Sequence, residues 1–237
     1  MNEPKESFPY KAPSEELKIK YSDIFSLDDP VNQKMFKTIF DKLASGIILL
    51  ISLPILLILK VVYLIEGFFI PENGGPMFFY YLSVSHGKII KKYKIRIIKE
   101  KFIDKEAASR HEWIAYSKEW SPESRTITGN FVKKWYLDEL PQFYSIFKGD
   151  MSFVGPRPLS ILHYERDLAQ GNVCRKLIKG GLLGYGHIHK GTSEMGNPQY
   201  EYEYIKKVIT YSQIKLFSLD LFIIWKGFLL VIKGGGH

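Results

Sequence analysis

Cysteine is almost absent from this chain of 237 residues, in which Cys174 is the only one. A single thiol excludes an internal disulfide and a cysteine-rich metal site, as expected for a protein of a reducing compartment. Repeats and low-complexity tracts are also missing, and the glycines lack the spacing of a Walker loop or a dinucleotide fingerprint. The N-terminus does not have the basic-then-apolar layout of a cleavable signal peptide, so export is not expected.

Acidic residues are fewer than basic ones, at 25 against 33, which gives a formal net charge of +8. The excess predicts an anionic partner, such as lipid headgroups, phosphorylated metabolites or nucleic acid. We expect no nucleic acid, because the basic residues are scattered and no recognised nucleic-acid-binding motif occurs. With 46% hydrophobic residues the chain can bury a substantial core. Residues 1–33 are polar and contain several prolines, which predicts a partly disordered N-terminal extension.

One apolar run, residues 47–65, has about the length needed to cross the hydrocarbon core of a membrane. Pro54 removes a backbone hydrogen bond in its middle, and Ser52 can take up part of the freed bonding. Lys60 lies inside the run and would be costly at the bilayer centre. We therefore predict that residues 34–70 form a re-entrant helix hairpin, which breaks near Ser52 and Pro54 and has both ends on the cytoplasmic face. The alternative is a buried core helix of a soluble protein.

Two segments after this run have the composition of a β-hairpin: MFFYYLSV, then a turn at Ser85-His86-Gly87-Lys88, then IIKKYKIRIIKE. The second strand alternates apolar and basic residues, so Lys92, Lys94 and Arg96 share one face. That face could bind phosphates or simply lie in solvent. Further along, residues 102–124 are predicted to be partly helical. Residues 126–136 are predicted to form a Gly-Asn turn followed by an amphipathic segment.

The most informative stretch is residues 137–158, LDELPQFYSIFKGDMSFVGPRP. Pro141 suits the first position of a helix and Gly149 the position just past its end, which predicts a helix over residues 141–148. Its N-terminal N–H groups favour carboxylates and phosphate oxygens, so Asp138 and Glu139 are expected to be ionised and close to any bound anion. Two carboxylates near a phosphate need a cation between them, and Mg²⁺ is the simplest choice. The alternative is an ordinary helix start with solvated acids.

The C-terminal third offers weaker signals. Helices are predicted over residues 159–169 and around residues 200–210. His187 and His189 lie in the glycine-rich stretch IKGGLLGYGHIHKG, but with no third ligand nearby we do not assign a metal site to them. The apolar run of residues 215–233 is interrupted by a lysine, which predicts an interfacial helix or one packed on the domain.

In the order of its parts, and in LDELPQFYSIFKGDMSFVGPRP and GGLLGYGHIHKG above all, the chain resembles the bacterial sugar transferase family from about residue 34 to residue 226. These are monotopic polyprenyl-phosphate phosphoglycosyl transferases, also called undecaprenyl-phosphate sugar phosphotransferases. The resemblance implies an α+β fold that is mostly helical with a small β-hairpin. It also implies membrane association through a re-entrant helix-break-helix at residues 34–70 and through interfacial helices. Residues 71–237 would then form the catalytic domain.

The resemblance also implies an activity, the transfer of a sugar-1-phosphate from a UDP-sugar to polyprenyl phosphate with release of UMP. Asp138 would be the nucleophile that forms a covalent phosphosugar intermediate, and Glu139 would bind Mg²⁺ with it or assist proton transfer. Lys94, Lys133 and Arg157 match basic residues of the family and would bind phosphate.

Arg96 is assigned to phosphate binding together with these residues. Tyr81 and Ser83 depart from the family pattern, which often has Gln and Arg in that strand.

The implied location is the cytosolic face of the bacterial inner membrane, at the first membrane step of exopolysaccharide, O-antigen, capsule or glycoprotein glycan synthesis. The implied partners are the UDP-sugar, polyprenyl phosphate, membrane lipid and downstream glycosyltransferases, and both a monomer and a homodimer are compatible with the sequence. Two alternatives are a membrane phosphatase with Asp138 as phosphoryl acceptor and a non-catalytic membrane scaffold of a polysaccharide assembly system.

Overall fold

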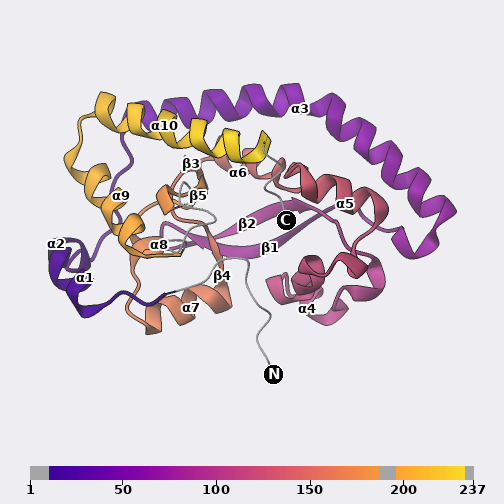
Figure 1. Cartoon of the computed structure of the whole chain (residues 1–237), viewed down its shortest axis with the longest axis horizontal. Coiled ribbons are helices and arrows are strands. Elements are labelled where there is room, and N and C mark those ends of the chain that lie inside the picture. The colour runs from indigo at the N-terminus through magenta and orange to yellow at the C-terminus, as the bar shows by residue number, and fades with distance from the viewer. Residues whose placement is uncertain (1–10, 187–195, 233–237) are drawn as a thin grey trace.

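A long antiparallel hairpin lies at the centre of the molecule (Figure 1). In the computed structural model, which describes residues 11–186 and 196–232, strand β1 is Phe78–Ser85 and strand β2 is Lys88–Ile95. His86 and Gly87 join them with φ of 56° and 69°. Positive φ at both central residues is what the two-residue type I′ turn of a tight hairpin requires. The predicted hairpin is therefore confirmed.

Three shorter strands complete the two sheets. Strand β4 pairs with β1 to give a three-stranded antiparallel sheet in the order β2-β1-β4, and β3 pairs with β5 in parallel. Their bounds are Ser152–Val154 for β3, Leu159–Ser160 for β4 and Gly181–Leu183 for β5. Since the remaining described elements are mostly helices, the predicted α+β class with a small sheet is confirmed.

Helix α3, Met35–Phe69, arches over the whole domain (Figure 1). Among the described residues it is the one helix long and apolar enough to cross a membrane. Its buried positions recur at intervals of four or seven and therefore share one stripe. They are Lys37, Asp41, Ser45, Ser52, Leu59 and Tyr63. The stripe that faces the protein is thus largely polar and the outward face is apolar, the reverse of a soluble surface helix.

The helix continues through Pro54 without an interruption. Figure 1 shows it bending along its length, so a bend takes the place of the predicted break between two helices. Proline removes one N–H and its ring crowds the carbonyl four residues back, which can bend a helix without ending it. The Ser52 hydroxyl donates to the Leu49 carbonyl at 2.9 Å. The re-entrant placement in a membrane stays a prediction.

Three helices lie alongside α3: α5, Ile127–Lys134; α6, Gln142–Lys148; and α10, Gln213–Ile232 (Figure 1). Helix α10 follows the first half of α3, where the Lys37 ammonium lies 2.7 Å from an Asp220 carboxylate oxygen. The C-terminal run is thus packed on the domain, one of the two predicted arrangements. Large apolar side chains of these helices remain exposed, among them Ile127, Phe131, Tyr144, Phe147, Phe222, Trp225 and Phe228.

The described part of the N-terminal extension contains two short helices. It forms helices α1, Glu15–Lys20, and α2, Ser22–Phe25. Leu17, Tyr21 and Ile24 are buried in the core cluster that also contains residues of α6, β3, α8 and α9. These three apolar residues are spaced by four and by three positions, so they lie on one helical face that packs on the core. The many polar residues around them in the sequence make this spacing hard to recognise.

Helices are confirmed within residues 102–124, over residues 159–169 and around residues 200–210, and a short helix at residues 174–177 was not predicted. Gly129 and Asn130 were expected to form a turn, but they lie inside α5, which begins earlier because Thr126 caps it through a bond to the Gly129 N–H. His187 and His189 lie outside the described residues. The remaining helices are α4 at Lys105–Ser109, α7 at Ile161–Ala169, α8 at Cys174–Leu177 and α9 at Gln199–Thr210, with 3-10 turns at Pro71–Asn73, Glu100–Phe102, Trp113–Trp120, Pro122–Ser124 and Leu137–Glu139.

Candidate active site

Asp138 is fully buried between helices α5 and α6. It lies in the 3-10 turn Leu137–Glu139, directly after Tyr136, whose φ of 56° is unusual for a bulky residue. That left-handed residue reverses the chain after α5. Pro141 then serves as the N-cap of α6, and Gly149 ends the helix at φ 91°. The helix predicted from these two residues is therefore confirmed to within one position.

Two lysines from different elements converge on the same oxygen of Asp138. Lys94 of β2 places its ammonium 3.2 Å from Oδ2, and Lys133 of α5 places its ammonium 3.7 Å from it. Lys94 also contacts Glu119, with Nζ 2.9 Å from Oε2 and 3.2 Å from Oε1. Burial opposes the charge on Lys94, but the carboxylates of Glu119 and Asp138 hold its pKa above the usual range. The site is therefore a buried alternation of opposite charges.

Glu139 and Arg157 form the more open edge of this cluster. An Arg157 Nη2 donates to Glu139 Oε1 at 2.7 Å, and the two side chains are 12% and 30% exposed. Burial disfavours the Glu139 carboxylate, but the charges of Arg157, Lys92 and Lys94 hold its pKa well below the usual range. Glu139 is thus ionised at neutral pH.

The corner that carries Arg157 is held from two sides. Arg175 donates its Nε hydrogen to the Arg157 carbonyl at 2.9 Å. Gly155 lies so close to the chain at Gly180–Gly181 that a Cβ on it would come within 2.3 Å of the Lys179 carbonyl oxygen. This close approach requires glycine and fixes the Gly-Pro-Arg-Pro turn against strand β5.

The basic face of β2 points into the protein. Lys92, Lys94 and Arg96 are all at most 2% exposed, so the alternative of a solvated strand face is wrong. Arg96 donates to three backbone carbonyls, those of Pro76, Asn73 and Ile98, at 2.9, 2.9 and 2.5 Å. These bonds give Arg96 a structural role, and its phosphate-binding role stays a prediction.

Two acidic residues of this region, Glu119 and Glu66, belong to no motif that the sequence analysis used. Their importance is apparent only from their contacts in the structure. Glu119 comes from the 3-10 helix Trp113–Trp120 and pairs with Lys94. Glu66, near the end of α3, accepts hydrogen bonds from the backbone N–H groups of Ile127 and Thr128 at 2.8 and 2.9 Å. Glu66 also accepts from the Thr128 hydroxyl. The end of α3 is therefore fastened to the start of the helix that carries Lys133.

Asp138 and Glu139 carry carboxylate oxygens, which are the kind of ligand that a magnesium ion prefers. Both carboxylate oxygens of Asp138 are buried and accept no hydrogen bond from the described residues. Within residues 11–186 and 196–232, no group of three or more acidic, histidine or cysteine side chains is close enough to ligate a metal. Because Mg²⁺ is commonly held by one or two carboxylates together with substrate phosphates, Asp138 and Glu139 fit such a site.

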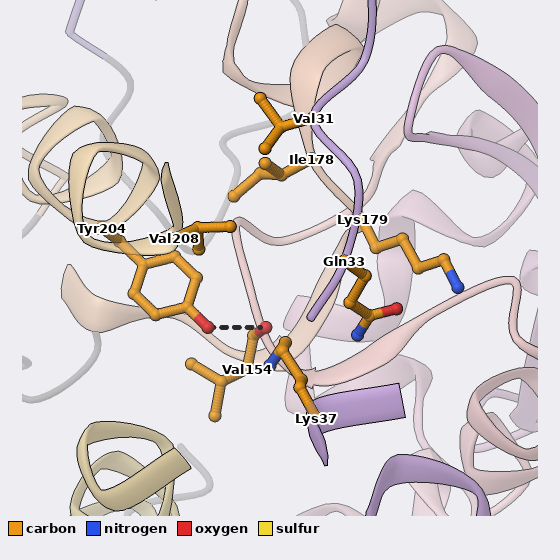
Figure 2. Close-up of a pocket in the computed structure, with 8 residues that line it drawn as sticks. All are labelled: Val31, Gln33, Lys37, Val154, Ile178, Lys179, Tyr204 and Val208. Carbon is orange, nitrogen blue, oxygen red and sulfur yellow. Dashed lines mark hydrogen bonds between the residues drawn. The ribbon is translucent and has the colours of Figure 1, made fainter. Parts of the chain in front are cut away.

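A separate cavity lies beneath the start of α3 (Figure 2). Its volume of about 20 Å³ suits a single water molecule. Among its lining residues, Lys37 pairs with Asp220 and Gln33 donates to Asp41 at 2.8 Å. Figure 2 shows Tyr204 donating to the Val154 carbonyl. The ion pair and the hydrogen bond beside this cavity join the start of α3 to α10 and to the segment before α3.

Comparison with known proteins gives similarities over most of the chain. Residues 32–234 match the family model described as bacterial sugar transferase. The UDP-glucose:undecaprenyl-phosphate glucose-1-phosphate transferase of Escherichia coli K12 is 29% identical over 85% of this chain and 42% of that protein. The protein of the same name from Klebsiella pneumoniae is 32% identical over 87% and 42%. The undecaprenyl-phosphate galactose phosphotransferase of Salmonella typhimurium LT2 is 33% identical over 57% and 29%. The chain spans less than half the length of these relatives.

Proposed function

The chain belongs to the bacterial sugar transferase family, and we propose that it moves a sugar-1-phosphate from a UDP-sugar to undecaprenyl or a related polyprenyl phosphate at a membrane. One observation carries this proposal. A buried carboxylate, Asp138, lies against two lysines, next to an Arg157–Glu139 pair at the more exposed edge. A nucleophile surrounded by fixed cations suits attack on a phosphate, because the cations stabilise charge on the phosphoryl oxygens.

The first step is attack by Asp138 on the sugar-linked phosphorus. A carboxylate oxygen forms a bond to that phosphorus, and the bond from the phosphorus to the bridging oxygen of the diphosphate breaks. UMP leaves with the electron pair, and the sugar phosphate remains on Asp138 as an acyl phosphate. In the second step an oxygen of polyprenyl phosphate attacks the same phosphorus. The bond to Asp138 then breaks, which restores the carboxylate and releases the polyprenyl diphosphate sugar.

The basic residues have separate tasks in this scheme. Lys94 and Lys133, which neutralise Asp138 in the structure, would move part of their interaction to the phosphoryl oxygens once Asp138 carries the phosphosugar as an acyl phosphate. Arg157 would exchange Glu139 for a substrate phosphate, which a guanidinium binds through paired N–H groups. Glu139 would then be free to act as an oxygen ligand. A bound Mg²⁺, held by Asp138 and Glu139, would neutralise the diphosphate of the donor.

The attachment of α3 supports a position in one leaflet. Lys37 near its start pairs with Asp220, and Glu66 near its end caps α5. Both ends are thus fixed to the same domain, and a helix fixed in this way cannot cross a bilayer that the domain does not cross. We propose that its apolar outer face, with those of α5, α6 and α10, enters the cytosolic leaflet of the inner membrane, while the polar stripe faces the domain.

The test is UMP release from a panel of UDP-sugars by purified protein in detergent, with and without polyprenyl phosphate and Mg²⁺. Release should require Mg²⁺ and should be lost in Asp138→Asn, while Asp150→Asn, a change in a nearby acid paired with Lys148, should behave as wild type. A UDP-sugar labelled at its sugar-linked phosphate should leave label on the protein when the lipid is omitted.

Other outcomes would favour the alternatives. Phosphate release without a lipid acceptor would point to a phosphatase. No turnover of any donor by folded protein, or full activity of Asp138→Asn, would overturn the transferase mechanism. Circular dichroism of the variant is needed beside the assay, because removing Asp138 leaves buried cations behind.

A further inference from the structure

Lys92 is the one cation of the charged cluster that lacks a carboxylate within ion-pair distance among the described residues. It is 1% exposed. Its ammonium makes a long hydrogen bond of 3.4 Å to the Pro158 carbonyl and lies 5.8 Å from the centre of the Tyr81 ring. Tyr81 is its cross-strand partner in the hairpin. These contacts are weak compensation for a buried positive charge.

The charge balance of the cluster points the same way. Four basic side chains face three carboxylates. The basic residues are Lys92, Lys94, Lys133 and Arg157, and the acids are Glu119, Asp138 and Glu139. Burial, and after it the charge of Arg157, lowers the pKa of Lys92 well below its usual range, so the ammonium form at this position depends on a nearby anion to stabilise it. An additional anion would restore the balance, since a buried charge is stable only when it is paired.

A purely structural role does not require this charge. A methionine has nearly the same length and would fill the same space without an ammonium to desolvate. A protein is often no less stable when a buried ion pair is replaced by apolar residues. Replacing a buried cation that has no carboxylate partner should reduce its stability even less. The ammonium lies against the carbonyl of Pro158, the residue after Arg157, and it is close enough to the Arg157 charge for that charge to lower the pKa of Lys92.

We propose that Lys92 binds a phosphoryl group of a substrate together with Arg157, as a second fixed cation of the transferase site. This inference rests on the proposed function for the identity of the substrate, but the anion-binding chemistry stands by itself. Two substrates could supply this phosphoryl group: the UDP-sugar through its diphosphate, and the lipid carrier through its phosphate monoester. In either case Lys92 contributes to binding and orientation, and it carries no bond-making role.

The experiment compares wild type with Lys92→Met and with the matched control Lys91→Met, a change in the exposed neighbour on the same strand. Melting temperature is measured in detergent without ligand. Binding of UDP, and separately of a short-chain polyprenyl phosphate, is measured by calorimetry. We expect Lys92→Met to melt at or above the wild-type temperature and to bind one of the two ligands at least tenfold more weakly, whereas Lys91→Met changes neither.

Weaker UDP binding would assign Lys92 to the donor, and weaker lipid phosphate binding with unchanged UDP binding would assign it to the carrier. Unchanged binding of both ligands would overturn the proposal, and so would a clear loss of melting temperature, because that result means the ammonium stabilises the fold. The binding measurements need no turnover. A failure of UMP release in wild type would therefore count against the proposed reaction while leaving the role of Lys92 to be decided by binding.

Discussion

Replacing Glu66 tests whether the end of helix α3 holds the candidate active site in place. Its carboxylate accepts hydrogen bonds from the first two N–H groups of α5 and from the Asn73 amide, the last at 2.6 Å. Loss of an N-terminal cap costs about 0.5–2 kcal/mol, and loss of the negative charge at a helix start about 0.3–1 kcal/mol more. With the Asn73 amide left unpaired as well, we expect Glu66→Ala to lower the free energy of unfolding by about 2–3 kcal/mol.

The effect on activity follows from the helix that Glu66 caps. Helix α5 carries Lys133, whose ammonium is 3.7 Å from Asp138, and a frayed first turn would loosen its position. We expect kcat/KM to fall about tenfold, which corresponds to roughly 1.4 kcal/mol. Glu66→Gln keeps one acceptor oxygen and should lose about 1 kcal/mol of stability.

The assay is urea unfolding in detergent, followed by circular dichroism, beside UMP release. Glu72→Gln is the control, because Glu72 is a half-exposed acid that pairs with Lys99 and Lys101 at the surface. Such pairs contribute about 0–1 kcal/mol. If Glu66→Ala were no less stable than Glu72→Gln, the capping argument would be refuted. If it lost stability but kept full turnover, the coupling of α3 to Lys133 would be refuted.

Further changes address the cluster and the bend. Arg157→Lys should raise KM for the UDP-sugar about tenfold despite the retained charge, because the paired N–H groups are lost, and unchanged kinetics would exclude that role. In the wild type, Arg157 keeps the Glu139 carboxylate charged as the pH falls through about 4.3, the usual pKa of a glutamate. Arg157→Met should therefore raise the pKa of Glu139 and move the acid limb of the kcat/KM profile to higher pH. An unmoved acid limb would argue against the Arg157–Glu139 pairing. Lys94→Met should cost about 3–5 kcal/mol in urea unfolding, since it leaves buried carboxylates without their cation, and a loss below 1 kcal/mol would contradict the geometry. Pro54→Ala should straighten α3 and lengthen the distance between spin labels placed near its two ends, and an unchanged distance would show that Pro54 does not cause the bend.

Local signals in the sequence determined much of the framework. His86-Gly87 predicts the hairpin because both residues tolerate positive φ. Pro141 and Gly149 mark the two ends of α6 through restrictions on their own backbones. The length of the apolar run indicates a long helix, and the stretch of residues 137–158 points to the family. Each of these features depends on neighbours in the chain, which is why it can be read without a fold.

Tertiary structure decided how the charges are used. The alternation of β2 shows that Lys92, Lys94 and Arg96 share a face, but only packing shows that this face is buried. Three backbone carbonyls give Arg96 its structural role, and Glu119, without a motif, becomes a partner of Lys94.

The polar stripe of α3 can likewise be explained only from the folded structure. Its buried ions are stable because distant segments bring opposite charges to them, as α10 does for Lys37. Such pairing is set by long-range contacts, so it depends on the folded chain as a whole.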